Sequence, residues 1–103
     1  MAYEVFPKPG TPVGPATLAV GERGQWRTKA WWSWCHPIEW RVKDAEGKLV
    51  AEDDGLDMTV FKYKFKTPGE YKIQAMERCP IWPNTFTSPW SNPIRVTVSE
   101  AVT

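Results

Sequence analysis

The sequence is poor in the residue types on which most catalytic and metal sites depend. Its 103 residues include only two cysteines and one histidine. A zinc site built from Cys35, His36 and Cys79 would lack a fourth ligand and paired Cys-x-x-Cys spacing. His36 directly follows Cys35, and neighbouring side chains diverge in an extended segment, so a nucleophile–base pair is not expected. We therefore predict a protein that is not an enzyme and has no metal or cofactor.

Long apolar runs and a strong net charge are also missing. No run approaches the ~18 residues that cross a bilayer, and the start, MAYEVFPKPG, does not resemble a signal peptide. The net charge of +1 gives no global attraction to nucleic acid or to a membrane. Residues 52–57 are acidic but lack the spacing of an EF-hand, so we expect a solvated loop there. Neither membrane nor nucleic-acid binding is predicted.

Proline, glycine and tryptophan are abundant instead. Ten prolines and seven glycines, spread along the chain, favour short strands and turns over helices. Residues 59–66 alternate Phe61, Tyr63 and Phe65 with lysines, a pattern typical of a half-buried antiparallel strand. About seven strands are expected, at residues 17–20, 25–32, 38–43, 48–51, 59–66, 69–77 and 94–99. This pattern predicts an all-β, two-sheet antiparallel sandwich.

The N-terminal residues form a separate unit in this prediction. Residues 1–16 contain four prolines and two glycines, and their apolar anchors are Tyr3, Val5 and Phe6. An extended arm is expected here, followed by a sandwich domain over residues 17–103. The arm either covers a sheet edge of its own domain or ties the chain to another subunit.

Several short motifs resemble those of immunoglobulin-like and fibronectin type III-like domains. Trp26 and Trp40 have the spacing of core residues on strands B and C of such domains, and Tyr71-Lys72-Ile73 lies where they carry Tyr-x-Cys. The tail SPWSNPIRVTVSE is similar to the last strand of a fibronectin type III domain. The resemblance covers about residues 17–99. It implies a core around both tryptophans and a tyrosine corner at Tyr71.

The sequence also departs from the antibody pattern. Trp26 and Ile73 occupy the positions of the inter-sheet disulfide, so this bridge is absent. The segment TPGEY is closer to bacterial and phage domains of this type. The resemblance also places the loops at residues 31–37 and 78–93 at one end of the sandwich. Cys35 and Cys79 would then be neighbours that could form a disulfide.

The chain has seven tryptophans, more than the core of a domain of this size usually holds, and most of them lie in these two loops. Rigid aromatic side chains dominate contact sites in proteins, but a long loop also folds onto itself and buries its own rings. The loops therefore form a contact site for protein or carbohydrate, a small local core, or both. The candidate residues are Trp31, Trp32, Trp34, Trp82, Phe86 and Trp90.

A second candidate surface is basic. In such sandwiches the strands at 25–32 and 59–66 are neighbours, which would place five cations on one outer face. This face either keeps the protein soluble or docks on an acidic surface. Nucleic acid is not expected, because the candidate aromatics lie elsewhere. The five residues are Arg27, Lys29, Lys62, Lys64 and Lys66.

The resemblance implies a structural or adhesive role. We expect a phage virion accessory protein, a capsid decoration or tail-associated module, that docks on capsid or tail subunits at the virion surface. The alternative is a secreted, extracellular module for adhesion or for binding a glycan. A third reading is a cysteine protease inhibitor of the chagasin type, from Pro80 and Trp82, although other motifs of that family are missing.

Overall fold

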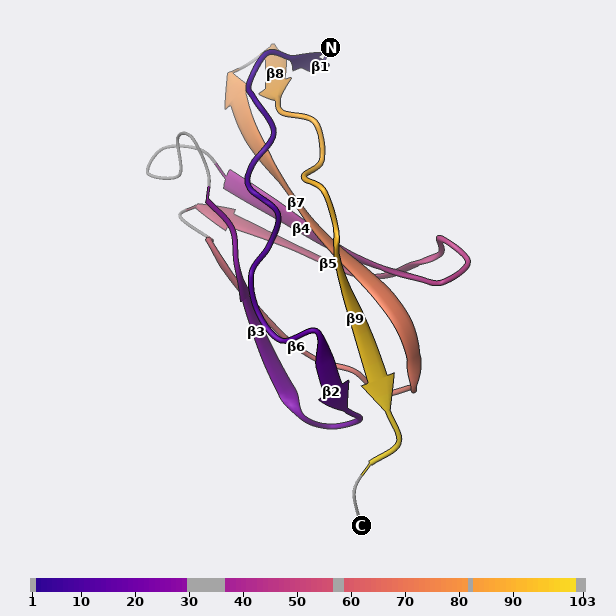
Figure 1. Cartoon of the computed structure of the whole chain (residues 1–103). Helices are drawn as coiled ribbons and strands as arrows, with labels where there is room; N and C mark the ends of the chain where they lie inside the picture. Colours follow the sequence, from indigo (N-terminus) through magenta and orange to yellow (C-terminus); the bar gives the residue numbers. More distant parts are fainter. Residues whose placement is uncertain (1, 30–36, 57–58, 82, 102–103) are drawn as a thin grey trace.

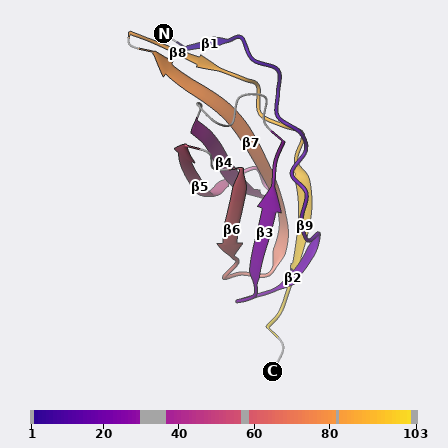
Figure 2. The same cartoon turned by 90° about the vertical axis from the view of Figure 1, so that its left-hand side faces the viewer.

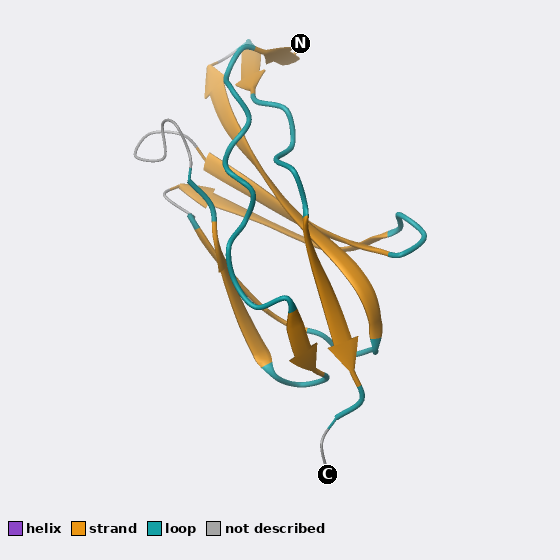
Figure 3. Cartoon of the chain, viewed as in Figure 1, coloured by secondary structure: helices purple, strands orange, loops and turns teal. Residues whose placement is uncertain are grey.

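The computed structural model describes residues 2–29, 37–56, 59–81 and 83–101. These residues form strands and loops without a helix (Figure 3). The all-β prediction is therefore confirmed for this part of the chain. In chain order the strands are β1 (Ala2–Glu4), β2 (Thr17–Ala19), β3 (Arg23–Arg27), β4 (Pro37–Asp44), β5 (Leu49–Leu56), β6 (Val60–Lys64), β7 (Gly69–Ile81), β8 (Asn84–Thr87) and β9 (Ile94–Ser99).

The larger of two sheets is organised around the long strand β7. One edge of β7 pairs with β4, which in turn pairs with β5. The other edge pairs first with β9, over Gly69–Ile73, and then with β8, over Arg78–Ile81. The short strands β2 and β1 add in parallel to β9 and β8 (Figure 1). β7 thus connects both halves of this sheet.

The smaller sheet consists of β3 and β6, which pair with Trp26 opposite Phe61. Figure 2 shows these two strands as a second layer in front of the larger sheet. Trp26, Trp40, Phe61 and Phe65 are at most 2% exposed. The Trp40 and Phe61 rings stack across the two sheets, with centroids 5.3 Å apart. This arrangement is compatible with a β-sandwich, and it confirms Trp26 and Trp40 as core residues.

The start of β7 forms the predicted tyrosine corner. The Tyr71 hydroxyl donates a 2.6 Å hydrogen bond to the Thr67 carbonyl, four residues upstream. Burial raises the pKa of the Tyr71 phenol, and the neighbouring Tyr63 and Asp44 raise it further. The corner fixes the turn that leads from β6 into β7.

Residues 2–16 lie against the strands of their own chain. Gly10 and Val13 donate backbone hydrogen bonds to the carbonyls of Lys29 and Arg27, respectively, and Thr97 donates to the Ala16 carbonyl. Figure 1 shows this segment running along most of the molecule. These contacts agree with an arm that covers its own domain. A tether to another subunit stays a prediction.

Several predicted element boundaries are wrong, three of them by several residues. Glu52–Leu56 continues β5 rather than forming a loop, and Asp54 is held by a 2.7 Å ion pair with Arg78. β3 ends at Arg27, before the predicted residue 32. Residues 78–93 are not one long loop, because they include the end of β7 and the additional strand β8. Each of these boundaries depends on pairing with residues distant in the sequence, so local composition does not predict it.

Candidate functional site

The end of β7 extends beyond its pairing with β4. The pairing of these strands reaches Glu77 opposite Ile38. Beyond it, among the described strands, Arg78–Ile81 pairs with β8 on the other side. β1 then lies along the outer edge of β8 (Figures 1 and 2). We call β1, β8 and the Arg78–Ile81 end of β7 the hairpin tip. It lies at the end of the molecule remote from the C-terminus.

The hairpin tip brings together one residue from each of two predicted contact sets: Tyr3 of the N-terminal arm and Phe86 of the aromatic loops. Tyr3 of the arm lies directly opposite Phe86, and their rings stack with centroids 5.7 Å apart. Tyr3 is 41% exposed, Val5 is 59% exposed and Phe86 is half-buried. The Val5 and Phe6 amides both donate to the Thr87 carbonyl, which fixes the arm against β8. The tip therefore presents a held but accessible apolar surface.

Trp90 does not lie at the tip with Phe86. After β8, the chain runs back along β7, where the Ser88 and Ser91 amides donate to the carbonyls of Glu77 and Ala75. The two serine hydroxyls accept hydrogen bonds from the amides of the same two residues. Side chains thus complete the pairing where the backbone is irregular. The segment brings Trp90 to the outer face of the larger sheet.

On that face, Trp90 is covered by Arg41. The Arg41 guanidinium carbon lies 3.9 Å from the centroid of the Trp90 ring, a cation–π contact. Arg41 also donates to the Gln74 side chain, which donates to the Ser91 carbonyl. Burial lowers the pKa of Arg41, and the Glu39 carboxylate acts in the opposite direction. This network holds the returning segment in place, and a partner-binding role for Trp90 stays a prediction.

Several candidate residues lie outside the described part of the chain: Trp31, Trp32, Trp34, Cys35, His36 and Trp82. Cys79 is a free, half-buried thiol opposite Phe86. The disulfide with Cys35 therefore stays a prediction. Within the described residues, no group of three side chains is arranged to hold a metal ion.

The five cations of the predicted basic face are all exposed on the smaller sheet or just beyond its strands. Arg23 lies opposite Lys64 and is a further member of this face. The sequence prediction missed Arg23 because it started the strand at Gln25. No ion pair involves these six residues within the described part of the chain. The basic face is thus a separate surface from the hairpin tip.

Comparison with known proteins assigns no family to this arrangement. No protein-family model and no curated protein matches the chain. Of the segments that the structure describes, none is a helix long and apolar enough to cross a membrane. The function therefore has to be argued from the surfaces themselves.

Proposed function

We propose that the chain is a non-catalytic immunoglobulin-like binding module that docks on a larger protein assembly through its hairpin tip. One observation carries this proposal: the stacked Tyr3–Phe86 pair, with Val5 beside it, is held in place and accessible. Ordering an apolar contact surface in advance lowers the entropic cost of binding. Aromatic side chains held in this way are typical centres of protein contacts.

The strand pairing supports the immunoglobulin-like assignment. β7 lies between β4 and β9 in one sheet, and β3 pairs with β6 in the other. Strands C, F and G share one sheet of such domains, and B and E share the other. With β3 and β4 as B and C, β6 as E, and β7 and β9 as F and G, the pairing agrees. The Tyr71 hydrogen bond is a second point of agreement.

Within this proposal, the assembly is a phage virion, with the chain as a capsid decoration or tail-associated protein. The resemblance of TPGEY to phage domains supports this choice. The capsid or tail subunits would be the partners, and the virion surface the location. Both the arm and the hairpin would contribute to this contact surface, since β1 pairs with β8.

The glycan-binding and protease-inhibitor alternatives have no supporting observation among the described residues. Trp26 and Trp40 are fully buried, so neither offers an open stacking platform, and the Arg41 guanidinium lies over the half-buried Trp90 ring. Trp82, on which the inhibitor reading depends, lies outside the described residues. We therefore do not develop either alternative.

The experiment is co-sedimentation of the purified protein with its own assembled particles. Tyr3→Ser and Phe86→Ser should each weaken binding about tenfold or more, since central aromatic contacts contribute most of the affinity. Val13→Ser is the matched control, because Val13 is 73% exposed and lies off the tip. It should bind like the original chain. Absence of binding by the original chain, or equal binding by the tip variants, would overturn the proposal.

A further inference from the structure

Three cations form a row across the outer face of the larger sheet. Lys43 of β4 lies directly opposite Lys72 of β7, and Lys72 lies directly opposite Arg95 of β9. Directly opposed residues project to the same face, and adjacent strands are about 4.8 Å apart, so the row spans about 10 Å. We call Lys43, Lys72 and Arg95 the cation row. It lies on the opposite side of the molecule from the basic face of β3 and β6.

The cation row forms no ion pair within the part of the chain that the structure describes. The ion pair found there joins Arg78 to Asp54, and none involves the row. Three carboxylates lie beside the row, those of Asp44, Glu46 and Glu70. Asp44 accepts hydrogen bonds from the backbone amides of the following turn, and Glu70 accepts one from the Thr97 hydroxyl. Like charges directly opposite in a sheet are destabilising. The opposed cations therefore repel one another, and no ion pair among the described residues offsets this repulsion.

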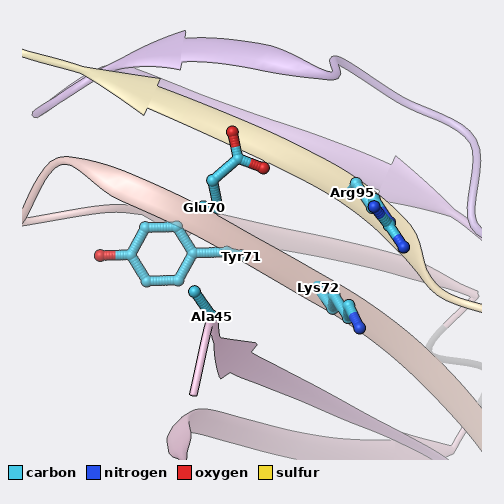
Figure 4. A pocket seen from close by; sticks show the side chains of 5 residues that line it. All are labelled: Ala45, Glu70, Tyr71, Lys72 and Arg95. Atoms are coloured by element: carbon cyan, nitrogen blue, oxygen red, sulfur yellow. The ribbon is translucent and has the colours of Figure 1, made fainter. Parts of the chain in front are cut away.

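Two hollows open along the row. One, of about 270 Å³, is lined by Lys72 and Arg95 together with Ala45, Glu70 and Tyr71. In Figure 4, Lys72 and Arg95 extend in the same direction from neighbouring strands, while Tyr71 leaves β7 on the other side. The second hollow, of about 410 Å³, is lined by Lys43 and Lys72, by the acidic residues Asp44 and Glu46, and by Ala45, Gly47, Gln74 and Pro93. Lys72 borders both hollows.

We propose that the cation row is a binding site for a small polyanion that carries at least two phosphate or carboxylate groups. Two adjacent hollows that share Lys72 suit two anionic groups on one ligand. Arginine binds such oxyanions through two parallel hydrogen bonds, and lysine binds them as a point charge. A bound polyanion would also remove the repulsion along the row. The site does not depend on the docking role of the hairpin tip.

The test uses tripolyphosphate and citrate as probes at low ionic strength, with calorimetric titration and thermal unfolding of the full chain. At least one probe should bind saturably and raise the unfolding temperature. Lys72→Gln should weaken that binding about tenfold or more. Without ligand, this variant should unfold at an equal or higher temperature, because the repulsion is gone. Lost binding without a loss of stability is not expected from a purely structural residue.

Lys62→Gln is the matched control, since it removes the same charge from the basic face on the other sheet. It should leave binding within about twofold. Arg95→Gln tests the row from another strand and serves if Lys72→Gln does not fold. Row-dependent binding of tripolyphosphate alone identifies a phosphate site, and binding of citrate as well extends the site to carboxylates. The proposal is overturned if neither probe binds, or if Lys62→Gln loses as much affinity as the row variants.

Discussion

Aromatic side chains have opposite roles at the hairpin tip and in the rest of the molecule, where the two sheets pack on each other. We call this two-layered part the body. In the body, Trp40 lies between both sheets and has no exposed surface. At the tip, Phe86 belongs to a layer of β1, β8 and the end of β7, and it remains half-buried beside an exposed Tyr3. The two rings differ in burial because the Trp40 ring is covered by two sheets, whereas the Phe86 ring belongs to a single layer. A fully covered ring stabilises the fold, whereas a partly covered ring is free to stabilise a complex.

The most severe way to probe the body is Trp40→Ala. Trp40 is fully buried and stacks on Phe61 of the opposite sheet, so its removal leaves a large cavity between the sheets. We expect a loss of about 3–5 kcal/mol in the free energy of unfolding. Urea unfolding followed by circular dichroism measures this loss. A change below about 1 kcal/mol would mean that Trp40 is not a central core residue.

Gly24→Ala tests how tightly the body is packed around Trp26. A β-carbon at residue 24 would lie 2.2 Å from the Trp26 ring and 2.8 Å from a Leu18 methyl group. We expect a loss of about 1–3 kcal/mol, because the ring has to shift within a closed core. Gly10→Ala is the matched control, since its nearest contact would be an ordinary 3.5 Å. Equal unfolding midpoints for the two variants would contradict the tight packing.

Tyr71→Phe removes the hydrogen bond to Thr67 and keeps the ring in the core. We expect a loss of about 1 kcal/mol in the free energy of unfolding at neutral pH. Burial raises the pKa of this phenol, so the folded state favours the neutral form. The corresponding stability is present below the unfolded-state pKa of about 10, and it is lost as the pH rises through the raised folded-state pKa.

The pH dependence separates the ionisation of Tyr71 from a general loss of packing. The original chain should lose stability above about pH 10, and Tyr71→Phe should lack this component. Tyr3→Phe, at the exposed stack of the tip, is the control and should follow the original profile. Identical alkaline profiles for all three chains would show that Tyr71 is not the group responsible.

The body could be predicted from the sequence because its pattern is local. Alternation of apolar and polar residues identified Phe61, Tyr71 and Ile73 as inward-facing, and each contributes to the observed core. The acidic stretch of β5 was misread for a related reason. Its composition resembles a loop, but its conformation depends on β4 and on Arg78, which lies 24 residues from Asp54.

The tip could not be predicted because its pairing joins opposite ends of the chain. The short strand β8 (Asn84–Thr87) has no clear alternation of buried and exposed residues, and its last three residues pair with residues 2–4. A parallel pair of this kind has no connecting turn to indicate it. The sequence of residues 88–93 also did not predict that the hydroxyls of Ser88 and Ser91 accept hydrogen bonds from β7. The sequence thus identified Tyr3 and Phe86 as candidates but did not predict their contact.

The smallest expected effect is the coupling energy between Tyr3 and Phe86, and it is the most direct test of the contrast between body and tip. The stack with Tyr3 is a cross-strand pair on a partly exposed layer, and such pairs contribute about 0.2–1 kcal/mol. A double-mutant cycle of Tyr3→Ala and Phe86→Ala should give a coupling energy in this range, measured by urea unfolding. A coupling energy of several kcal/mol would place the pair in the core of the fold. In that case the tip would resemble the body, and an accessible docking surface would no longer describe it.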